Sequence, residues 1–345
     1  MLRATVLICL FSWPLCAQTD FSKLDAILAD YKESDAFNGT ILIAHDGKVT
    51  YSRSLGYADF PNQIPLDKTT PMHLASISKG FTTLCIMILK ERGLLHYEDE
   101  AKNYLEDFPY DQMTIRHLMT STSGLKRLYN KATDGDDVVA IDDMVRFIVS
   151  KKPKLQFKPG DEFLSSIVGY CLLAAVIEKV SGKRFDQFLA DEIFNSLEMG
   201  NTFLLTNENR NRFKAISYDA KNKEKEWFLG SYSGGVGIYS SAEDLLKWDQ
   251  ALYSEVLVSK ETLAVAFEPF VYNDGTASHV TMGGWMRWKG QENLIFKNGD
   301  WVANNAILFR DIERKVTIII INNRQNKISK FDLMDEILPV LGYSI

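Results

Sequence analysis

Residues 73–93 of the chain read HLASISKGFTTLCIMILKERG. From Gly80 to Gly93 the side chains are apolar on most sides of a helix, which predicts a helix buried at the centre of a domain. Ser76 lies at the entrance to this helix, where free backbone N–H groups favour developing negative charge. Lys79 follows three residues later, on the same face and one turn away. A partly desolvated ammonium group loses basicity, so Lys79 could accept the proton of Ser76.

The Ser76-Ile77-Ser78-Lys79 pattern has two interpretations. S-x-x-K is one element of a set found in serine acyl-transfer enzymes, together with S-D-N and K-T-G. The same four residues also fit a serine that caps a helix and a lysine that is solvated. Because the tetrapeptide is common, the rest of the chain has to decide between the two.

Strands are predicted near both ends of the chain, before and after this motif. Residues 41–44 form an apolar strand that turns at Asp46-Gly47 and returns through Val49 and Tyr51, a strong hairpin pattern. Four further strand candidates follow late in the chain, at 279–289, 293–301, 305–311 and 315–323.

Helical patterns occupy most of the remaining chain. An amphipathic helix is expected at 21–34, helices with loops at about 98–210, a helix at 242–253 and a last helix at 328–342. This order predicts an α+β fold, with one antiparallel sheet assembled from both chain ends, helices packed on it, and a mostly α-helical lobe between. The expected division is an α/β lobe of about 18–75 and 215–345, and a helical lobe of about 76–214.

The first 17 residues, MLRATVLICLFSWPLCA, have the layout of a secretory signal peptide. One early cation, Arg3, precedes an apolar run from Ala4 to about Leu15, and the run ends near the small residue Ala17. Cleavage is expected after Ala17; a lipoprotein site at Cys16 is less favoured because Leu15 is bulky. We therefore expect an exported protein, periplasmic or secreted, with no membrane anchor after cleavage.

Composition narrows the partners and cofactors. The 345-residue chain has a formal charge of −6, which argues against nucleic acid as the main partner. A small-molecule or peptide substrate is expected instead. The histidines show no H-E-x-x-H pattern, and Gly234–Gly237 lacks the context of a nucleotide-binding loop, so neither a metal nor another cofactor is predicted. Cys85 and Cys171 are expected to be buried, and the sequence leaves open whether they meet.

The chain resembles the serine β-lactamase-like family, which includes class C β-lactamases, DD-peptidases and their esterase relatives. The resemblance rests on five segments in family order. They are residues 37–59, 113–125, 158–182, 233–252 and 318–323. It implies a penicillin-binding-protein (β-lactamase/transpeptidase-like) scaffold with the site in a cleft between two lobes, Ser76 as nucleophile and Lys79 as its base.

The second element of this family is usually Tyr-x-Asn. Alignment on Pro159-Gly160 and Gly169-Tyr170 puts it at Ser165-Ser166-Ile167, so Ser165 replaces the tyrosine and Ile167 the asparagine. Isoleucine cannot make the side-chain hydrogen bonds that asparagine supplies. Ser165 either took over the proton shuttle or marks a site that has decayed.

The third element is Lys297-Asn298-Gly299, which resembles Lys-Thr-Gly. The resemblance implies a strand edge that binds substrate, with the backbone N–H groups of Ser76 and Asp300 forming the oxyanion hole. An ordinary Asn-Gly turn is the alternative. The nearby Trp285, Trp288 and Trp301 either line the cleft or belong to the core.

These features favour a serine hydrolase that cleaves an ester, amide or lactam through an acyl-enzyme on Ser76. An esterase or peptidase is favoured over a β-lactamase, because the missing tyrosine weakens deacylation. The alternative is a catalytically impaired binding protein that kept the cleft. A transacylase would need an acceptor site that the sequence does not reveal.

Overall fold

The computed structural model describes residues 19–127, 140–225 and 232–344. The predicted signal peptide at 1–17 lies outside the described residues. Within the described part, none of the helices is long and apolar enough to cross a membrane.

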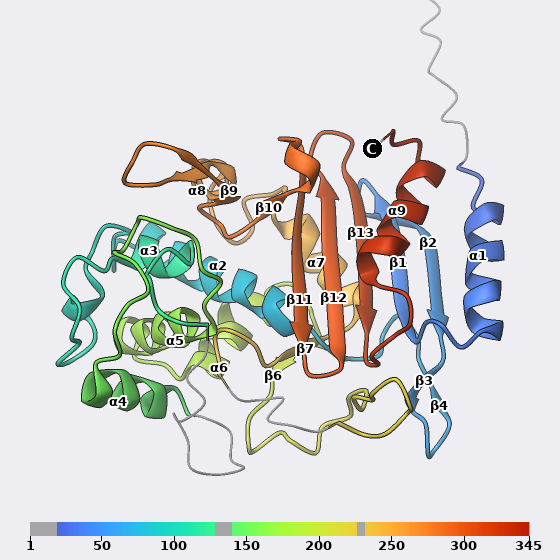
Figure 1. The fold of residues 1–345 in the computed structure, drawn as a ribbon, viewed down its shortest axis with the longest axis horizontal. Helices are drawn as coiled ribbons and strands as arrows, with labels where there is room; N and C mark the ends of the chain where they lie inside the picture. Colours follow the sequence, from blue (N-terminus) through green and yellow to red (C-terminus); the bar gives the residue numbers. More distant parts are fainter. Residues whose placement is uncertain (1–18, 128–139, 226–231, 345) are drawn as a thin grey trace, which may run out of the picture.

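An eight-stranded antiparallel sheet dominates the structure, and both ends of the chain contribute to it (Figure 1). The strand order is β2-β1-β13-β12-β11-β10-β9-β8. The strands are β1 (Gly39–His45), β2 (Lys48–Leu55), β8 (Pro269–Val271), β9 (Ala277–Thr281), β10 (Met286–Arg287), β11 (Leu294–Trp301), β12 (Asn304–Asp311) and β13 (Val316–Asn322). The predicted hairpin at Asp46-Gly47 is confirmed, since β1 and β2 pair on either side of it.

The four consecutive isoleucines 318–321 in β13 show why this sheet has a layer on each face. All four are buried, and successive side chains of a strand point to opposite faces. Ile318 and Ile320 pack with the residues of helices α1 (Ser22–Glu33) and α9 (Lys330–Val340), whereas Ile319 and Ile321 pack with the large core on the other side. A strand covered on both faces reads as a continuous apolar run.

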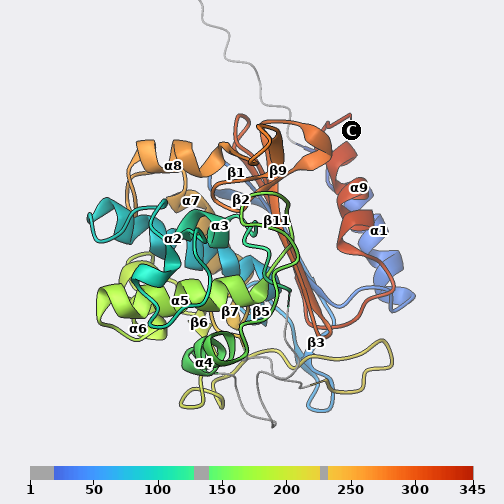
Figure 2. The same ribbon diagram turned by 60° about the vertical axis from the view of Figure 1, so that its left-hand side comes forward.

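Helices cover the two faces unequally (Figure 2). Helices α1 and α9 lie side by side on one face, and the helical lobe packs on the other. The remaining helices are α2 (Ser78–Glu91), α3 (Ile115–Met119), α4 (Ile141–Lys151), α5 (Ile167–Ser181), α6 (Phe185–Leu189), α7 (Ala242–Ala251) and α8 (Lys260–Phe267). Helix α2, predicted as the buried central helix, has twelve buried residues from Ser78 to Leu89.

Some predicted elements differ from the structure. The strand expected at 279–289 is broken into β9 and β10, because Gly284 has a φ of +73 and the chain turns there. A three-stranded sheet of β5 (Met72–His73), β7 (Ile238–Ser240) and β6 (Phe203–Leu204) was not predicted, since its strands are only two or three residues long. Another small sheet pairs β3 (Tyr57–Asp59) with β4 (Ile64–Pro65).

The open alternatives for the tryptophans and cysteines are settled by burial. Trp285, Trp288 and Trp301 are all buried and belong to the two hydrophobic cores, so they are not the walls of a cleft. Cys85 and Cys171 are buried and free.

Candidate active site

Ser76 lies in a tight turn between β5 and α2. It is the middle residue of a single 3-10 turn, Ala75–Ile77, that leads directly into α2. Ala75 has a φ of +49, a conformation that is uncommon for a residue with a side chain. The buried His73 holds this turn, because its Nδ1 accepts a hydrogen bond of 3.0 Å from the Ala75 N–H. The turn presents Ser76 to the pocket described below.

Strand β11 passes very close to the same turn at Gly299. A Cβ atom added to Gly299 would lie 2.6 Å from the backbone nitrogen of Ser76 and 2.6 Å from the carbonyl oxygen of Leu74. Both contacts are with backbone atoms that cannot rotate away. Glycine is therefore required here for the strand to approach Ser76 this closely.

We expect Gly299→Ala to lower kcat/KM by about 100-fold, since a displacement of roughly 1 Å can cost that much in rate. Gly200→Ala is the matched control, because nothing lies within 4 Å of a Cβ added at Gly200. Circular dichroism and thermal unfolding should show that both variants fold. Equal activity of Gly299→Ala and Gly200→Ala would contradict the required close approach.

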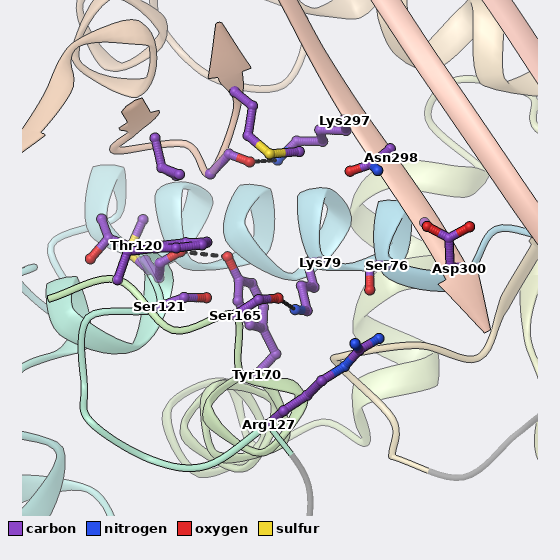
Figure 3. Close-up of a pocket in the computed structure, with 16 residues that line it drawn as sticks. Ser76, Lys79, Thr120, Ser121, Arg127, Ser165, Tyr170, Lys297, Asn298 and Asp300 are labelled. Atoms are coloured by element: carbon purple, nitrogen blue, oxygen red, sulfur yellow. Dashed lines mark hydrogen bonds between the residues drawn. The ribbon is translucent and has the colours of Figure 1, made fainter. Parts of the chain in front are cut away.

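Lys79 is buried in α2, and its ammonium group lies in the pocket (Figure 3). The Nζ atom donates a hydrogen bond of 3.0 Å to Ser165 Oγ and lies 5.2 Å from the centre of the Tyr170 ring. Burial, helped by the positive charge of Arg127, lowers the pKa of Lys79 to about 7. A lysine with such a pKa is about half neutral at pH 7, so its neutral form can act as a base.

The second predicted element, Ser165-Ser166-Ile167, divides into three different environments. Ser165 lines the pocket with Lys79. Ser166 caps α5, since its Oγ accepts from the Gly169 N–H at 2.9 Å. Ile167 is fully buried against Gly235 and does not line the pocket. The position where the family has asparagine therefore belongs to the core in this chain.

Tyr170 lines the pocket but does not replace the missing tyrosine. Its hydroxyl group donates to the Met119 carbonyl oxygen, and burial raises its pKa to about 12. A phenol that is bonded in this way and this weakly acidic is a poor proton shuttle. Ser165 is the hydroxyl group in hydrogen-bond contact with Lys79.

The third predicted element lies within β11. The strand runs unbroken from Leu294 to Trp301, so the alternative of an Asn-Gly turn is wrong. In the described sheet β10 pairs only with Ile295 and Phe296 of β11, which leaves residues 297–301 as an open edge beside Ser76. An open strand edge offers backbone N–H and C=O groups to a ligand.

Lys297 reaches across the pocket to the turn between β9 and β10. Its Nζ donates to the carbonyl oxygens of Gly283 and Gly284, each at 2.9 Å, and lies 4.8 Å from the centre of the Trp285 ring. Burial and the nearby Lys79 lower the pKa of Lys297 to about 7. Lys297 therefore ties the wall of the pocket to β11 besides contributing charge.

One pocket of about 230 Å³ brings the predicted residues together. Its walls include every residue that was predicted for the site, namely Ser76, Lys79, Ser165, Lys297, Asn298, Gly299 and Asp300. Sequence reasoning missed Arg127, Phe163 and the pair Thr120-Ser121, which also line it. The segment 113–125 contributed to the family resemblance, but no pattern showed which of its side chains face the cleft.

Metal binding has no support in the described ranges. No group of three or more histidine, cysteine, aspartate or glutamate side chains is placed there to hold an ion. The pocket combines Ser76 with two lysines whose pKa values are lowered and with the backbone of β11.

Comparison with known proteins agrees with this geometry. The family model described as Beta-lactamase matches residues 24–338. The chain belongs to the beta-lactamase family. This is a family of serine hydrolases, and the chain has its hydrolase scaffold.

Individual relatives carry related names. The chain is 30% identical to Penicillin-binding protein 4* of Bacillus subtilis (strain 168) over 323 residues, 88% of this chain and 71% of that protein. The octameric penicillin-binding protein homologue from Pyrococcus abyssi has a TM-score of 0.79 at 24% identity, covering 94% of this chain and 78% of that one. The Beta-Lactamase/D-Alanine Carboxypeptidase from Pseudomonas syringae has a TM-score of 0.76 at 15% identity, covering 94% and 98%. These structural likenesses show the fold.

Proposed function

We propose that the protein is an exported serine hydrolase that cleaves a carboxylic ester or amide through an acyl-enzyme on Ser76. The observation that carries the proposal is the buried Lys79, whose pKa is about 7 and whose Nζ donates to Ser165 Oγ beside Ser76. Burying a lysine costs free energy, and strongly shifted pKa values cluster at functional sites. Export rests on the leader-like residues 1–17.

In the proposed acylation step, Ser76 Oγ attacks the substrate carbonyl carbon while neutral Lys79 takes the hydroxyl proton. The proton passes through Ser165 Oγ to the leaving group, whose bond to the carbonyl carbon breaks. The backbone N–H groups of Ser76 and Asp300 hold the oxyanion. In the second step a water molecule attacks the acyl carbon while Lys79 takes its proton. The bond between the acyl carbon and Ser76 Oγ then breaks, Lys79 returns the proton to Ser76 Oγ, and the carboxylic acid leaves.

Substrate preference is proposed from the second element. Ser165, which is hydrogen-bonded to Lys79, can pass a proton to the leaving group. The buried Ile167 side chain, in contrast, cannot form a hydrogen bond with a substrate amide. Hydrolysis of a β-lactam acyl-enzyme needs a well-placed base for water, and the tyrosine that would assist it is absent. We therefore favour an esterase or peptidase over a β-lactamase, although Penicillin-binding protein 4* of Bacillus subtilis is named for penicillin binding.

A catalytically impaired binding protein is the second candidate. The observation that favours it is the burial of Ile167 in the core, where a family member would present an amide to the pocket. The intact pair of Ser76 and Lys79 argues against it, because a decayed enzyme has little reason to keep a buried lysine in the pocket with the serine.

Turnover of small substrates separates the two candidates. Purified protein should be assayed against 4-nitrophenyl esters, D-alanyl-D-alanine peptides and nitrocefin, with Ser76→Ala in parallel. We expect ester or peptide hydrolysis that is lost in Ser76→Ala and exceeds nitrocefin hydrolysis. Binding of these compounds by both proteins without turnover by either would favour the binding protein.

The pH dependence should report Lys79. Because its neutral form is the base, kcat/KM for a neutral ester should rise with pH and level off above a midpoint near 7. Arg127→Gln removes a neighbouring positive charge, so the pKa of Lys79 and the midpoint should both move to higher pH. Lys126 is next to Arg127 in sequence but does not line the pocket. Lys126→Gln should therefore leave the midpoint unchanged. A midpoint that is equal in all three proteins would contradict the assignment of Lys79 as base.

A further inference from the structure

Lys330 is a buried cation behind the strand that faces Ser76. It is the first residue of α9 and is 5% exposed, which is rare for a lysine. Its Nζ donates to Asp300 Oδ1 at 2.6 Å and to the carbonyl oxygen of Gly299 at 3.2 Å. Both partners belong to the open edge of β11 in the pocket.

The Gly299 carbonyl group that Lys330 contacts is directly bonded to the proposed oxyanion donor. The Gly299 C=O and the Asp300 N–H belong to the same peptide group. A cation on the oxygen of a peptide group draws electron density away from its nitrogen, which makes the N–H a stronger hydrogen-bond donor. The close approach of Gly299 to the Ser76 backbone nitrogen, described above, puts this peptide group beside the nucleophile.

The negative charge of the Asp300 carboxylate is offset by its ion pair with Lys330. A carboxylate that shares a residue with an oxyanion donor repels the negative charge that develops on the substrate oxygen. The Asp300 carboxylate is 64% exposed, whereas its partner Lys330 is 4% exposed at the side chain. The ion pair therefore holds a positive charge against the carboxylate from the protein side.

We propose that Lys330 is a positioning residue of the oxyanion hole. It fixes and polarises the Gly299–Asp300 peptide group and neutralises the Asp300 carboxylate, so that negative charge can form on the substrate oxygen. This role rests on the proposed function, in which the Asp300 N–H binds that oxygen. A simpler role is that Lys330 only ties α9 to the sheet, and the two roles give different results when both partners are changed.

The test compares Lys330→Met, Asp300→Asn and the double variant in stopped-flow acylation by a 4-nitrophenyl ester. Lys330→Met leaves an unpaired carboxylate beside the oxyanion, so we expect an acylation rate lower by about 10- to 100-fold, with KM changed less than threefold. Asp300→Asn alone removes the carboxylate and leaves Lys330 on the Gly299 carbonyl oxygen, and it serves as the single-variant reference for the double variant. The double variant should recover most of the rate that Lys330→Met lost, because the repelling charge is gone.

Further measurements distinguish this role from one in which Lys330 only holds α9 against the sheet. Lys327→Met removes a nearby exposed lysine whose Nζ donates to the Ser34 carbonyl oxygen, away from the pocket, and it should not change acylation. Unfolding of every variant by urea gives its stability. The infrared carbonyl stretch of the acyl-enzyme should move to higher frequency in Lys330→Met, since a weaker oxyanion hole polarises the carbonyl less.

The inference is overturned if Lys330→Met acylates at the wild-type rate, or if its loss is not recovered in the double variant and follows stability alone. A wild-type protein that forms no acyl-enzyme is a separate result. That outcome removes the proposed function and, with it, the oxyanion that Lys330 would serve.

Discussion

Replacing Lys79 by methionine should lower the rate of Ser76 acylation by about 10³-fold or more, because it removes the general base and leaves an apolar side chain of similar length. The buried site accepts such a change, since methionine needs no hydrogen bond where Lys79 now donates to Ser165. Pre-steady-state release of 4-nitrophenol from an ester measures this step directly.

The matched control is Lys90→Met, which changes a lysine in the last turn of the same helix. It should acylate at the wild-type rate. A Lys79→Met protein that is folded and acylates within tenfold of the wild type would show that another group deprotonates Ser76.

The second large effect is expected on stability, at the ion pair between Asp249 and Arg310. Both side chains are 0% exposed, with Arg310 Nε 2.5 Å from Asp249 Oδ1, and Thr317 Oγ1 donates to the other carboxylate oxygen at 2.6 Å. Arg310 also lies 5.3 Å from the centre of the Trp285 ring, and the Lys297 Nζ lies 4.8 Å from the same centre. The pair thus supports the sheet behind the pocket.

We expect Asp249→Ala to lower the free energy of unfolding by about 3–5 kcal/mol, since it leaves the buried Arg310 charge without the opposite charge of a carboxylate. The double variant Asp249→Ala/Arg310→Met should be more stable than Asp249→Ala, because it removes that charge as well. Urea unfolding followed by tryptophan fluorescence gives both values.

The exposed pair Lys289–Asp335 is the control for this comparison. Asp335 lies within α9, and Asp335→Ala should cost less than about 1 kcal/mol, as is usual for surface ion pairs. Equal losses for Asp249→Ala and Asp335→Ala would contradict the structural role of the buried pair.

Much of the fold could be predicted because its signals are local. The turn at Asp46-Gly47, the apolar helix after Ser76 and the isoleucine run in β13 each specify an element through a short pattern. The short strands β5, β6 and β7 could not be predicted, since two or three residues carry no periodicity.

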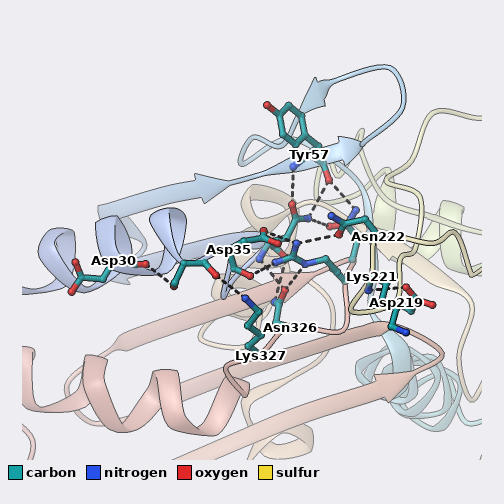
Figure 4. A network of polar contacts seen from close by, with 12 residues as sticks. Asp30, Asp35, Tyr57, Asp219, Lys221, Asn222, Asn326 and Lys327 are labelled. Atoms are coloured by element: carbon teal, nitrogen blue, oxygen red, sulfur yellow. Dashed lines mark hydrogen bonds and ion pairs between the residues drawn. The ribbon is translucent and has the colours of Figure 1, made fainter.

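Long-range polar contacts also escaped prediction (Figure 4). Asn38 Nδ2 donates to Asn323 Oδ1 at 2.6 Å, and Arg324 Nη1 donates to Asp35 Oδ1 at 2.7 Å, in each case across more than 280 residues of sequence. These contacts join the start of β1 to the end of β13 and satisfy buried polar groups there. No local sequence pattern around an asparagine or arginine predicts a hydrogen-bond partner so distant in sequence.

The candidate site was predicted as a set of residues but not as a network. The S-x-x-K spacing indicated Ser76 and Lys79, the family resemblance implied Ser165 and Lys297, and all four line one pocket. The bonds from Lys297 to Gly283 and Gly284, and from Lys330 to Gly299, depend on backbone geometry that only the folded chain provides. Arg127 was missed because a single cation after a glycine-containing loop carries no distinctive pattern.

The most direct measurement is the intact mass of the purified protein after exposure to a fluorophosphonate, with Ser76→Ala treated in parallel. An activated serine forms a stable phosphonyl ester, so we predict a mass gain of one adduct on the wild type and none on Ser76→Ala. Peptide mapping should place the adduct on Ser76. The absence of an adduct on folded wild-type protein, or an equal adduct on Ser76→Ala, would contradict the assignment of Ser76 as the nucleophile.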